Sequence, residues 1–135
     1  MCGFVGFTNY INNSNIVLEN MMNKIIHRGP DSGGTYIDDG IALGFRRLSI
    51  IDLAQGDQPI LNEDGSKVLL FNGEIYNFQS IREKLIAAGH KFKTKTDSEV
   101  LLHGYEEYGK NLLNMLRGMF AFVIWDKNKR AFWRT

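Results

Sequence analysis

The sequence predicts an α+β fold in which antiparallel sheets are layered with helices. Short runs rich in β-branched and aromatic residues flank two or three segments with helical spacing of apolar residues. Hairpin signals, of which Asp39-Gly40 is the clearest, join the runs in place of the regular strand–helix alternation that builds a parallel sheet. We therefore expect antiparallel sheets packed against helices.

The N-terminal half should contain a strand, a helix and a hairpin. The apolar run Cys2–Phe7 suits a buried strand. Ser14 is placed to cap a helix over Asn15–His27, which Gly29 and Pro30 should end. Asp39-Gly40 should then connect two strands, Thr35–Ile37 and Ile41–Phe45.

The C-terminal half should contain two helices and three strands. Asn77 is expected to cap a helix that reaches Ala88 and stops at Gly89. The pattern Thr96-Asp97-Ser98-Glu99 predicts a capping box and a helix to about Tyr108. Strands are expected at Lys67–Phe71, ending on Asn72-Gly73, and at Met119–Trp125 and Ala131–Trp133.

Composition limits the class of protein. The length of 135 residues suits one domain, and the net charge of +1 gives no general reason to bind nucleic acid or an anionic membrane. The chain opens without a signal-peptide pattern, and its apolar runs are too short to span a membrane. A single cysteine excludes an internal disulfide framework and is compatible with a reducing compartment. We expect a soluble, cytoplasmic domain without nucleic-acid or membrane partners.

Cys2, the only cysteine, directly follows the initiator methionine. A small second residue permits removal of Met1, after which Cys2 would carry both a thiol and a free α-amino group. Because an α-amino group titrates near ~7.7–8.0, it can act as the base for a thiol whose own pKa is ~8.5. The alternative is that Cys2 is a buried small hydrophobic residue, and its position leaves both interpretations open.

A series of motifs decides between them and resembles the N-terminal glutaminase domain of glutamine-dependent asparagine synthetase, a class II glutamine amidotransferase. The motifs that carry the resemblance follow Cys2 in this order: His27-Arg28-Gly29-Pro30-Asp31-Ser32, Arg47-Leu48-Ser49-Ile50-Ile51-Asp52, Gly56-Asp57-Gln58-Pro59, Phe71-Asn72-Gly73-Glu74-Ile75-Tyr76-Asn77, Thr96-Asp97-Ser98-Glu99 and Leu116-Arg117-Gly118-Met119-Phe120-Ala121-Phe122. The resemblance covers residues 2–135 and implies an N-terminal-nucleophile hydrolase fold, with two antiparallel sheets sandwiched between helix layers.

The resemblance also implies the catalytic groups. Cys2 would attack the side-chain amide of L-glutamine, and its α-amine would pass the proton to the leaving ammonia. Asn72 and Gly73 match the oxyanion hole of the family, through a side-chain amide and a backbone N–H. An ordinary Asn-Gly turn at the end of a strand is the structural alternative for this pair.

Substrate binding is implied for a second group of residues. Arg47 matches the carboxylate clamp of the family, since a guanidinium can donate two parallel hydrogen bonds to a carboxylate. Its neighbour Arg46 should point to the opposite face of the strand. Asp97 and Glu74 match ligands of the substrate ammonium, although an acid in a first helical turn also suits the helix dipole. The backbone would line the pocket at Leu48, Ser49, Ile50 and Ile51.

Cofactors and metals are not expected for the glutaminase reaction. His90 and His103 have no partners at ligand spacing in the sequence, so we expect no metal site. The family carries ATP and magnesium in a large synthetase domain that follows further glutaminase strands. Residues 1–135 therefore predict an amidotransferase domain that is incomplete at its C-terminus, with a synthetase domain as its partner in the parent protein.

Three functions remain open at this point. The domain could hydrolyse L-glutamine to glutamate and ammonia, it could bind glutamine with little turnover, or it could be a fragment that only dimerises through exposed strand edges. Glutamate release separates the first from the second, and a thermal shift on adding glutamine separates the second from the third.

Overall fold

A computed structural model describes residues 2–9, 12–48 and 57–135, with the side chains of residues 132 and 133 excepted. The first sheet has the strand order β1-β3-β2, from β1 (Gly3–Thr8), β2 (Ser32–Ile37) and β3 (Ile41–Arg47). The second sheet has the order β4-β5-β6-β7, from β4 (Ile60–Leu61), β5 (Lys67–Ile75), β6 (Gly118–Asp126) and β7 (Ala131–Arg134). Every pairing in both sheets is antiparallel.

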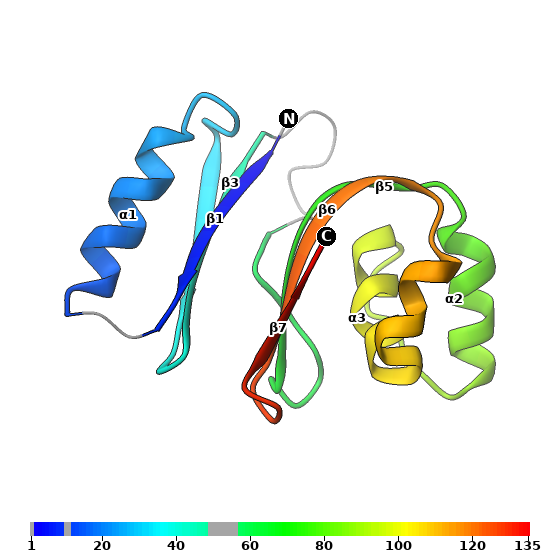
Figure 1. Ribbon diagram of the computed structural model, residues 1–135. Helices are drawn as coiled ribbons and strands as arrows, with labels where there is room; N and C mark the ends of the chain where they lie inside the picture. Colours follow the sequence, from blue (N-terminus) through cyan, green and yellow to red (C-terminus); the bar gives the residue numbers. More distant parts are fainter. Residues whose placement is uncertain (1, 10–11, 49–56) are drawn as a thin grey trace.

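The sheets lie face to face between two helical layers (Figure 1). Helix α1 (Ser14–Lys24) covers the outer face of the first sheet. Helices α2 (Phe78–Ala87) and α3 (Asp97–Tyr108), with the short 3₁₀ helix η1 (Gly109–Met115), cover the outer face of the second. The expected sandwich of two antiparallel sheets between helix layers is confirmed.

Alternating side chains on the strands fill three buried layers. Leu18 and Met22 of α1 pack on Ala42 of the first sheet. Between the sheets, side chains of β3, β5 and β6 form one cluster, which we call the inter-sheet cluster: Ile41, Leu43, Phe45, Val68, Leu70, Val123 and Trp125. The opposite faces of β5 and β6 pack on α3, through residues that include Leu69, Phe71, Leu101 and Phe122. This period of two assigns each strand residue to one side of its sheet.

Strand β5 does not end on Asn72-Gly73 as the sequence suggested. It continues to Ile75, and Gly73 pairs with Phe120 of β6. Gly73 has a φ of +151°, and a Cβ there would clash with the Met119 carbonyl oxygen and with the backbone of Phe120. The glycine therefore permits close approach of the neighbouring strand within the sheet, and the Asn-Gly turn alternative is wrong.

Two helix starts also differ from their predicted caps. Helix α1 begins at Ser14 after Asn13, which has a left-handed φ of 65°, and it ends at Lys24 and not at His27. Asn77 does precede α2, but its side chain makes no cap hydrogen bond to that helix. Its amide instead donates to the Met115 carbonyl over 2.8 Å and accepts from the Arg117 N–H over 2.8 Å. Asn77 thereby ties the start of α2 to the segment before β6.

The expected capping box at α3 is wrong as well. Thr96 precedes the helix, but its side chain makes no cap hydrogen bond. The Glu99 carboxylate accepts hydrogen bonds from the Lys93 and Thr94 backbone N–H groups, each over 2.7 Å. Glu99 therefore anchors the loop before α3, because that loop presents free N–H groups to it.

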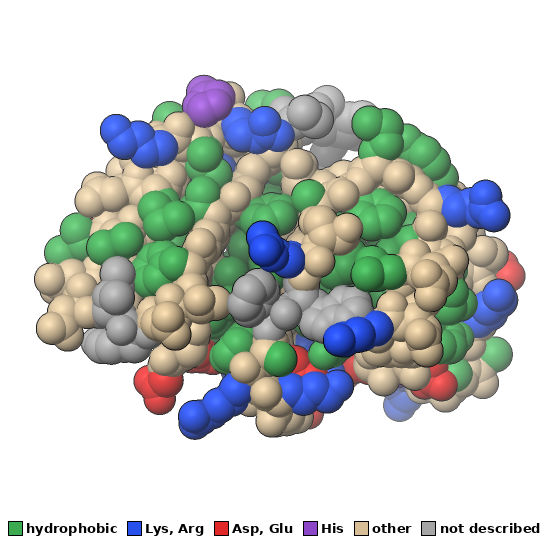
Figure 2. Space-filling view, viewed as in Figure 1, with side chains coloured by type: hydrophobic (Ala, Val, Ile, Leu, Met, Phe, Trp, Pro, Cys, Tyr) green, Lys and Arg blue, Asp and Glu red, His purple; other side chains and the backbone are tan. Residues whose placement is uncertain are grey.

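Figure 2 shows the molecule in the same orientation as Figure 1, in which both sheets are seen edge-on. Apolar side chains occupy much of this face. Acidic side chains gather mainly at the lower edge of this view, at the end where the β2–β3 and β6–β7 turns lie. Among the residues that the structure describes, no helix is both long and apolar enough to cross a bilayer.

Candidate active site

Cys2 lies at the start of β1, against the end of β3. The Leu48 backbone N–H donates to the Cys2 sulfur over 3.4 Å, and the thiol lies 3.8 Å from the Leu48 carbonyl oxygen as a weak donor. Arg28 Nε donates to the Cys2 carbonyl oxygen over 3.1 Å, so Arg28 holds the nucleophile's own backbone. The half-buried Cys2 side chain packs against the inter-sheet cluster.

The two arginines that end β3 point to opposite faces of its sheet, as expected. Phe45 belongs to the inter-sheet cluster, so Arg47, two residues further on, lies on the same face as that cluster. Arg46 faces the other side, where its guanidinium donates to the Gly29 and Pro30 carbonyls over 2.9 and 3.3 Å. Arg46 therefore fastens the segment that follows α1, and Arg47 is the arginine on the Cys2 side.

Asn72 and Glu74 lie on the face of β5 that is turned toward the first sheet. Val68 and Leu70 of β5 belong to the inter-sheet cluster, and Asn72 and Glu74 continue their alternation. Ile75 lies on the opposite face, in the cluster with α3. The alternation thus assigns the Asn72 amide and the Glu74 carboxylate to the face of the second sheet that is turned toward the first sheet, where Cys2 and Arg47 lie.

Asp57 and Gln58 lie near Arg47 but were not among the predicted site residues. The sequence analysis quoted their motif, Gly56-Asp57-Gln58-Pro59, only as part of the family resemblance. Arg47 Nη1 lies 3.2 Å from Asp57 Oδ1; the Arg47 side chain is 10% exposed and that of Asp57 is 92% exposed. The Gln58 amide accepts from the Phe71 N–H over 2.6 Å and donates to the Phe71 carbonyl over 2.9 Å. Gln58 therefore fastens this segment to β5, beside a cavity of about 280 Å³ that Arg47 and Asp57 help to line.

Asp97 connects the first turn of α3 to the end of β5. Its Oδ2 accepts a hydrogen bond from the Ile75 N–H over 2.9 Å. Burial raises the pKa of the Asp97 carboxyl, backbone N–H groups of Ile75, Asp97 and Ser98 oppose that shift, and the Glu74 charge adds to it. A partly buried carboxylate beside a second acid is suited to accept a cation.

The structure thus brings Cys2 to Leu48, places Arg47 beside it at the end of β3, and brings Asp97 to the end of β5 next to Glu74. Gly73 lies in β5 between Asn72 and Glu74. The predicted pocket residues Ser49, Ile50 and Ile51 lie outside the described residues.

Another cavity lies at the other end of the strands. It has a volume of about 580 Å³ and is lined by the β2–β3 turn, Trp125 and the basic residues Lys127 and Arg130. None of the predicted glutamine-site residues lines it. Its size therefore does not point to the chemistry that the Cys2 end suggests.

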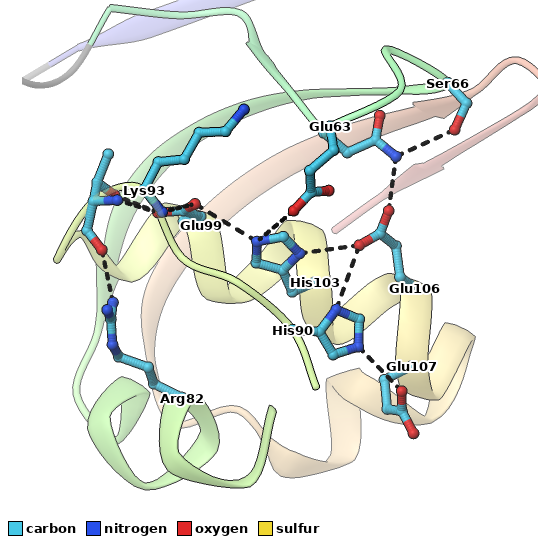
Figure 3. A network of polar contacts seen from close by, with 11 residues as sticks. Glu63, Ser66, Arg82, His90, Lys93, Glu99, His103, Glu106 and Glu107 are labelled. Carbon is cyan, nitrogen blue, oxygen red and sulfur yellow. Dashed lines mark hydrogen bonds and ion pairs between the residues drawn. The ribbon is translucent and has the colours of Figure 1, made fainter. Parts of the chain in front are cut away.

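A second polar cluster lies between the segment after α2 and helix α3 (Figure 3). His90 and His103 share the Glu106 carboxylate, so the expectation that these histidines lack partners at ligand spacing is wrong. The hydrogen bond to Glu106 raises the pKa of His103, and burial opposes it. Helical spacing on α3 places Glu99 and Glu106 beside His103, whereas His90 comes from the segment after α2 and reaches Glu106 only through the fold.

Comparison with known proteins agrees with this architecture. The glutamine amidotransferase domain family matches residues 1–134. Asparagine synthetase [glutamine-hydrolyzing] 1 of Bacillus subtilis is 47% identical over 133 residues, covering 95% of this chain and 21% of that protein. A probable asparagine synthetase [glutamine-hydrolyzing] of Dictyostelium discoideum is 40% identical over 136 residues, covering 98% of this chain and 24% of that protein.

A solved structure shares the fold. Glutamine phosphoribosylpyrophosphate amidotransferase from B. subtilis superposes with a TM-score of 0.73 at 24% identity, covering 94% of this chain and 35% of the other.

The chain spans between about a fifth and a quarter of the length of the two asparagine synthetases compared above. Because the family match extends over residues 1–134, the chain belongs to the glutamine amidotransferase domain family.

Proposed function

We propose that this domain hydrolyses L-glutamine to glutamate and ammonia through a thioester on Cys2. The observation that carries the proposal is the position of the Cys2 thiol, which accepts a hydrogen bond from the Leu48 backbone on the inner face of the first sheet, where Arg47 also lies, opposite the face of β5 that carries Asn72. Membership of the glutamine amidotransferase family supports the choice of substrate.

The reaction would proceed in two steps once Met1 has been removed. The Cys2 sulfur forms a bond to the amide carbon of glutamine, the α-amine takes the thiol proton, and the carbon–nitrogen bond breaks as that proton goes to the departing ammonia. Water then attacks the thioester, the carbon–sulfur bond breaks, and glutamate leaves. Arg28 would position the nucleophile through its hydrogen bond to the Cys2 carbonyl.

Asn72 and Gly73 are proposed to stabilise the oxyanion formed in each step. The Asn72 side-chain amide is a neutral donor on the face of β5 turned toward the first sheet, and the backbone N–H of Gly73, the next residue in the strand, would be the second donor. Preorganised donors of this kind lower the barrier because they need no reorganisation as charge develops.

The charged ends of glutamine would be bound by residues on both sides of the site. Arg47 would clamp the α-carboxylate, in exchange for the exposed Asp57 carboxylate that it contacts in this structure. Glu74 and Asp97 would accept the α-ammonium, and the Leu48–Ile51 backbone would line the pocket. An exposed ion-pair partner is held weakly, so its replacement by a substrate carboxylate costs little.

The ammonia is proposed to serve an asparagine-synthetase-type amidation. Both curated relatives compared above are named as glutamine-hydrolysing asparagine synthetases, and the chain covers only part of each. ATP and magnesium would act in the synthetase domain, and the glutaminase step itself would need no cofactor.

Glutamate release, measured on a sample whose intact mass is known, tests this proposal. A protein that lacks Met1 should release glutamate and ammonia in equal amounts from L-glutamine. A processed protein that binds glutamine without releasing glutamate would contradict the proposed activity and favour a binding module. A sample that retains Met1 is first treated with methionine aminopeptidase, because the α-amine is otherwise part of a peptide bond.

Asp97→Asn is expected to weaken glutamine binding while leaving folding stability equal or higher at neutral pH. Burial raises the pKa of this carboxyl in the folded protein, so its contribution to stability is greatest below its ordinary pKa of ~3.9 and is lost as the pH rises through the raised value. Asparagine keeps an oxygen for the Ile75 N–H but loses the charge that would bind an ammonium. Melting temperatures and calorimetric titration with glutamine measure both effects.

Asp39→Asn, at an exposed position of the β2–β3 turn, is the matched control. It should change neither glutamine affinity nor stability. A clear drop in the melting temperature of Asp97→Asn at neutral pH would contradict the burial argument, and unchanged affinity would remove Asp97 from the ammonium site.

A further inference from the structure

We infer that His90, His103 and Glu106 form a binding site for a divalent transition-metal ion such as Zn²⁺. One donor atom from each residue lies within 4.8 Å of the other two. Glu106 Oε2 lies 3.0 Å from His103 Nδ1 and 3.7 Å from His90 Nδ1. Tetrahedral zinc with ligand bonds of ~2.0 Å separates neighbouring donors by ~3.3 Å, which lies between these two distances.

The remaining ring nitrogens of both histidines face carboxylates. His90 Nε2 lies 3.1 Å from Glu107 Oε2. His103 Nε2 lies 3.6 Å from Glu99 Oε1 and 3.8 Å from Glu63 Oε1. In metal sites, such outer carboxylates accept the proton on the far ring nitrogen and so turn the near nitrogen toward the ion.

The third ligand is oriented in the same way. Asn62 Nδ2 donates to Glu106 Oε1 over 2.7 Å, which leaves Oε2 directed at the two histidines (Figure 3).

The donor set selects the class of ion. Two imidazole nitrogens and one carboxylate oxygen suit Zn²⁺, Cu²⁺ or Ni²⁺, whereas Ca²⁺ and Mg²⁺ prefer oxygen ligands throughout. Four glutamates, at positions 63, 99, 106 and 107, face the two rings, so a dication would offset an excess of negative charge. Three protein ligands leave a fourth position for water.

A bound ion would join the segment after α2 to helix α3. His103 and Glu106 lie on α3, whereas His90 follows α2. The His103 side chain is 2% exposed and that of His90 is 18% exposed, so the ion would lie at the edge of the buried core. The ion would therefore stabilise the packing of the helical layer, at a site separate from Cys2.

Calorimetric titration of the metal-free protein with Zn²⁺, together with absorption spectra of the Co²⁺ form, tests the inference. We expect one equivalent of Zn²⁺ to bind and to raise the melting temperature. Co²⁺ should give the visible bands of a tetrahedral site without a thiolate charge-transfer band. His90→Ala and Glu106→Gln should each weaken Zn²⁺ affinity more than ~100-fold, and Glu107→Gln, outside the ligand set, about 10–100-fold.

Two control variants separate this site from other metal-binding groups. His27→Ala removes the exposed histidine outside the cluster, and Cys2→Ala removes the only thiol. Neither should change Zn²⁺ affinity. The absence of Zn²⁺ binding, or affinity that survives in His90→Ala, would overturn the inference and leave the cluster as an ion-pair network. His90→Ala decides the question even if substitution of the buried His103 unfolds the protein.

Discussion

Cys2→Ala is expected to abolish glutamate release while the protein still binds glutamine. Alanine has no nucleophile, so the thioester cannot form, yet the Arg47, Glu74 and Asp97 groups proposed to bind the substrate remain. Cys2 also packs against the inter-sheet cluster and accepts the Leu48 N–H, so a modest loss of stability is expected. Glutamate release and the thermal shift caused by glutamine measure the two properties separately.

Cys2→Ser is the matched variant for this experiment. Serine keeps the size, the α-amine and a hydrogen-bonding atom, but its hydroxyl is a much weaker nucleophile at neutral pH. It should therefore fold like the wild type, bind glutamine and lose nearly all turnover. Glutamate release by Cys2→Ala at the wild-type rate would rule out Cys2 as the nucleophile.

Asn72→Ala is expected to lower the turnover number about 10²–10³-fold with little change in glutamine affinity. Loss of one oxyanion donor typically costs about 3 kcal/mol of transition-state stabilisation, and that interaction is made only as the oxyanion forms. The substitution removes no strand hydrogen bond, because β5 pairs with β6 through its backbone. Steady-state kinetics, with glutamine affinity measured separately in the Cys2→Ala background, check the result.

Asn128→Ala provides the comparison for Asn72→Ala. Asn128 is an exposed asparagine in the β6–β7 turn, and its substitution should leave turnover unchanged. If Asn72→Ala instead raised the dissociation constant for glutamine about 10²–10³-fold and left the turnover number unchanged, Asn72 would be assigned to ground-state binding and not to the oxyanion hole.

Local pattern was sufficient to predict the layered fold and the faces of β3. The period of two along a strand separates Arg46 from Arg47 whatever surrounds them, and the structure places Arg46 toward α1 and Arg47 toward the inter-sheet cluster. The Asp39-Gly40 hairpin and the β6–β7 hairpin also follow from short-range turn chemistry.

The helix starts could not be predicted as well, because their polar side chains found distant partners. Asn77 bonds to the backbone at Met115 and Arg117, and Glu99 bonds to the loop at Lys93 and Thr94. A side chain that can cap a helix can equally satisfy any nearby backbone group, and only the packed fold decides which group is near. The sequence also places the end of β5 too early, at Asn72-Gly73, because the pairing with β6 continues to Ile75 and local turn chemistry does not reveal it.

The amino-acid sequence alone indicates the chemistry, through a thiol at position 2, an arginine on one face of a strand and a set of motifs in a recognisable order. Tertiary structure alone decided which groups meet. It brings Leu48 to the Cys2 sulfur, Asp57 to Arg47 and His90 to Glu106. The available chemistry follows from residue identity and short-range periodicity. Contacts between segments far apart in the chain depend on how the two sheets and the helical layer pack.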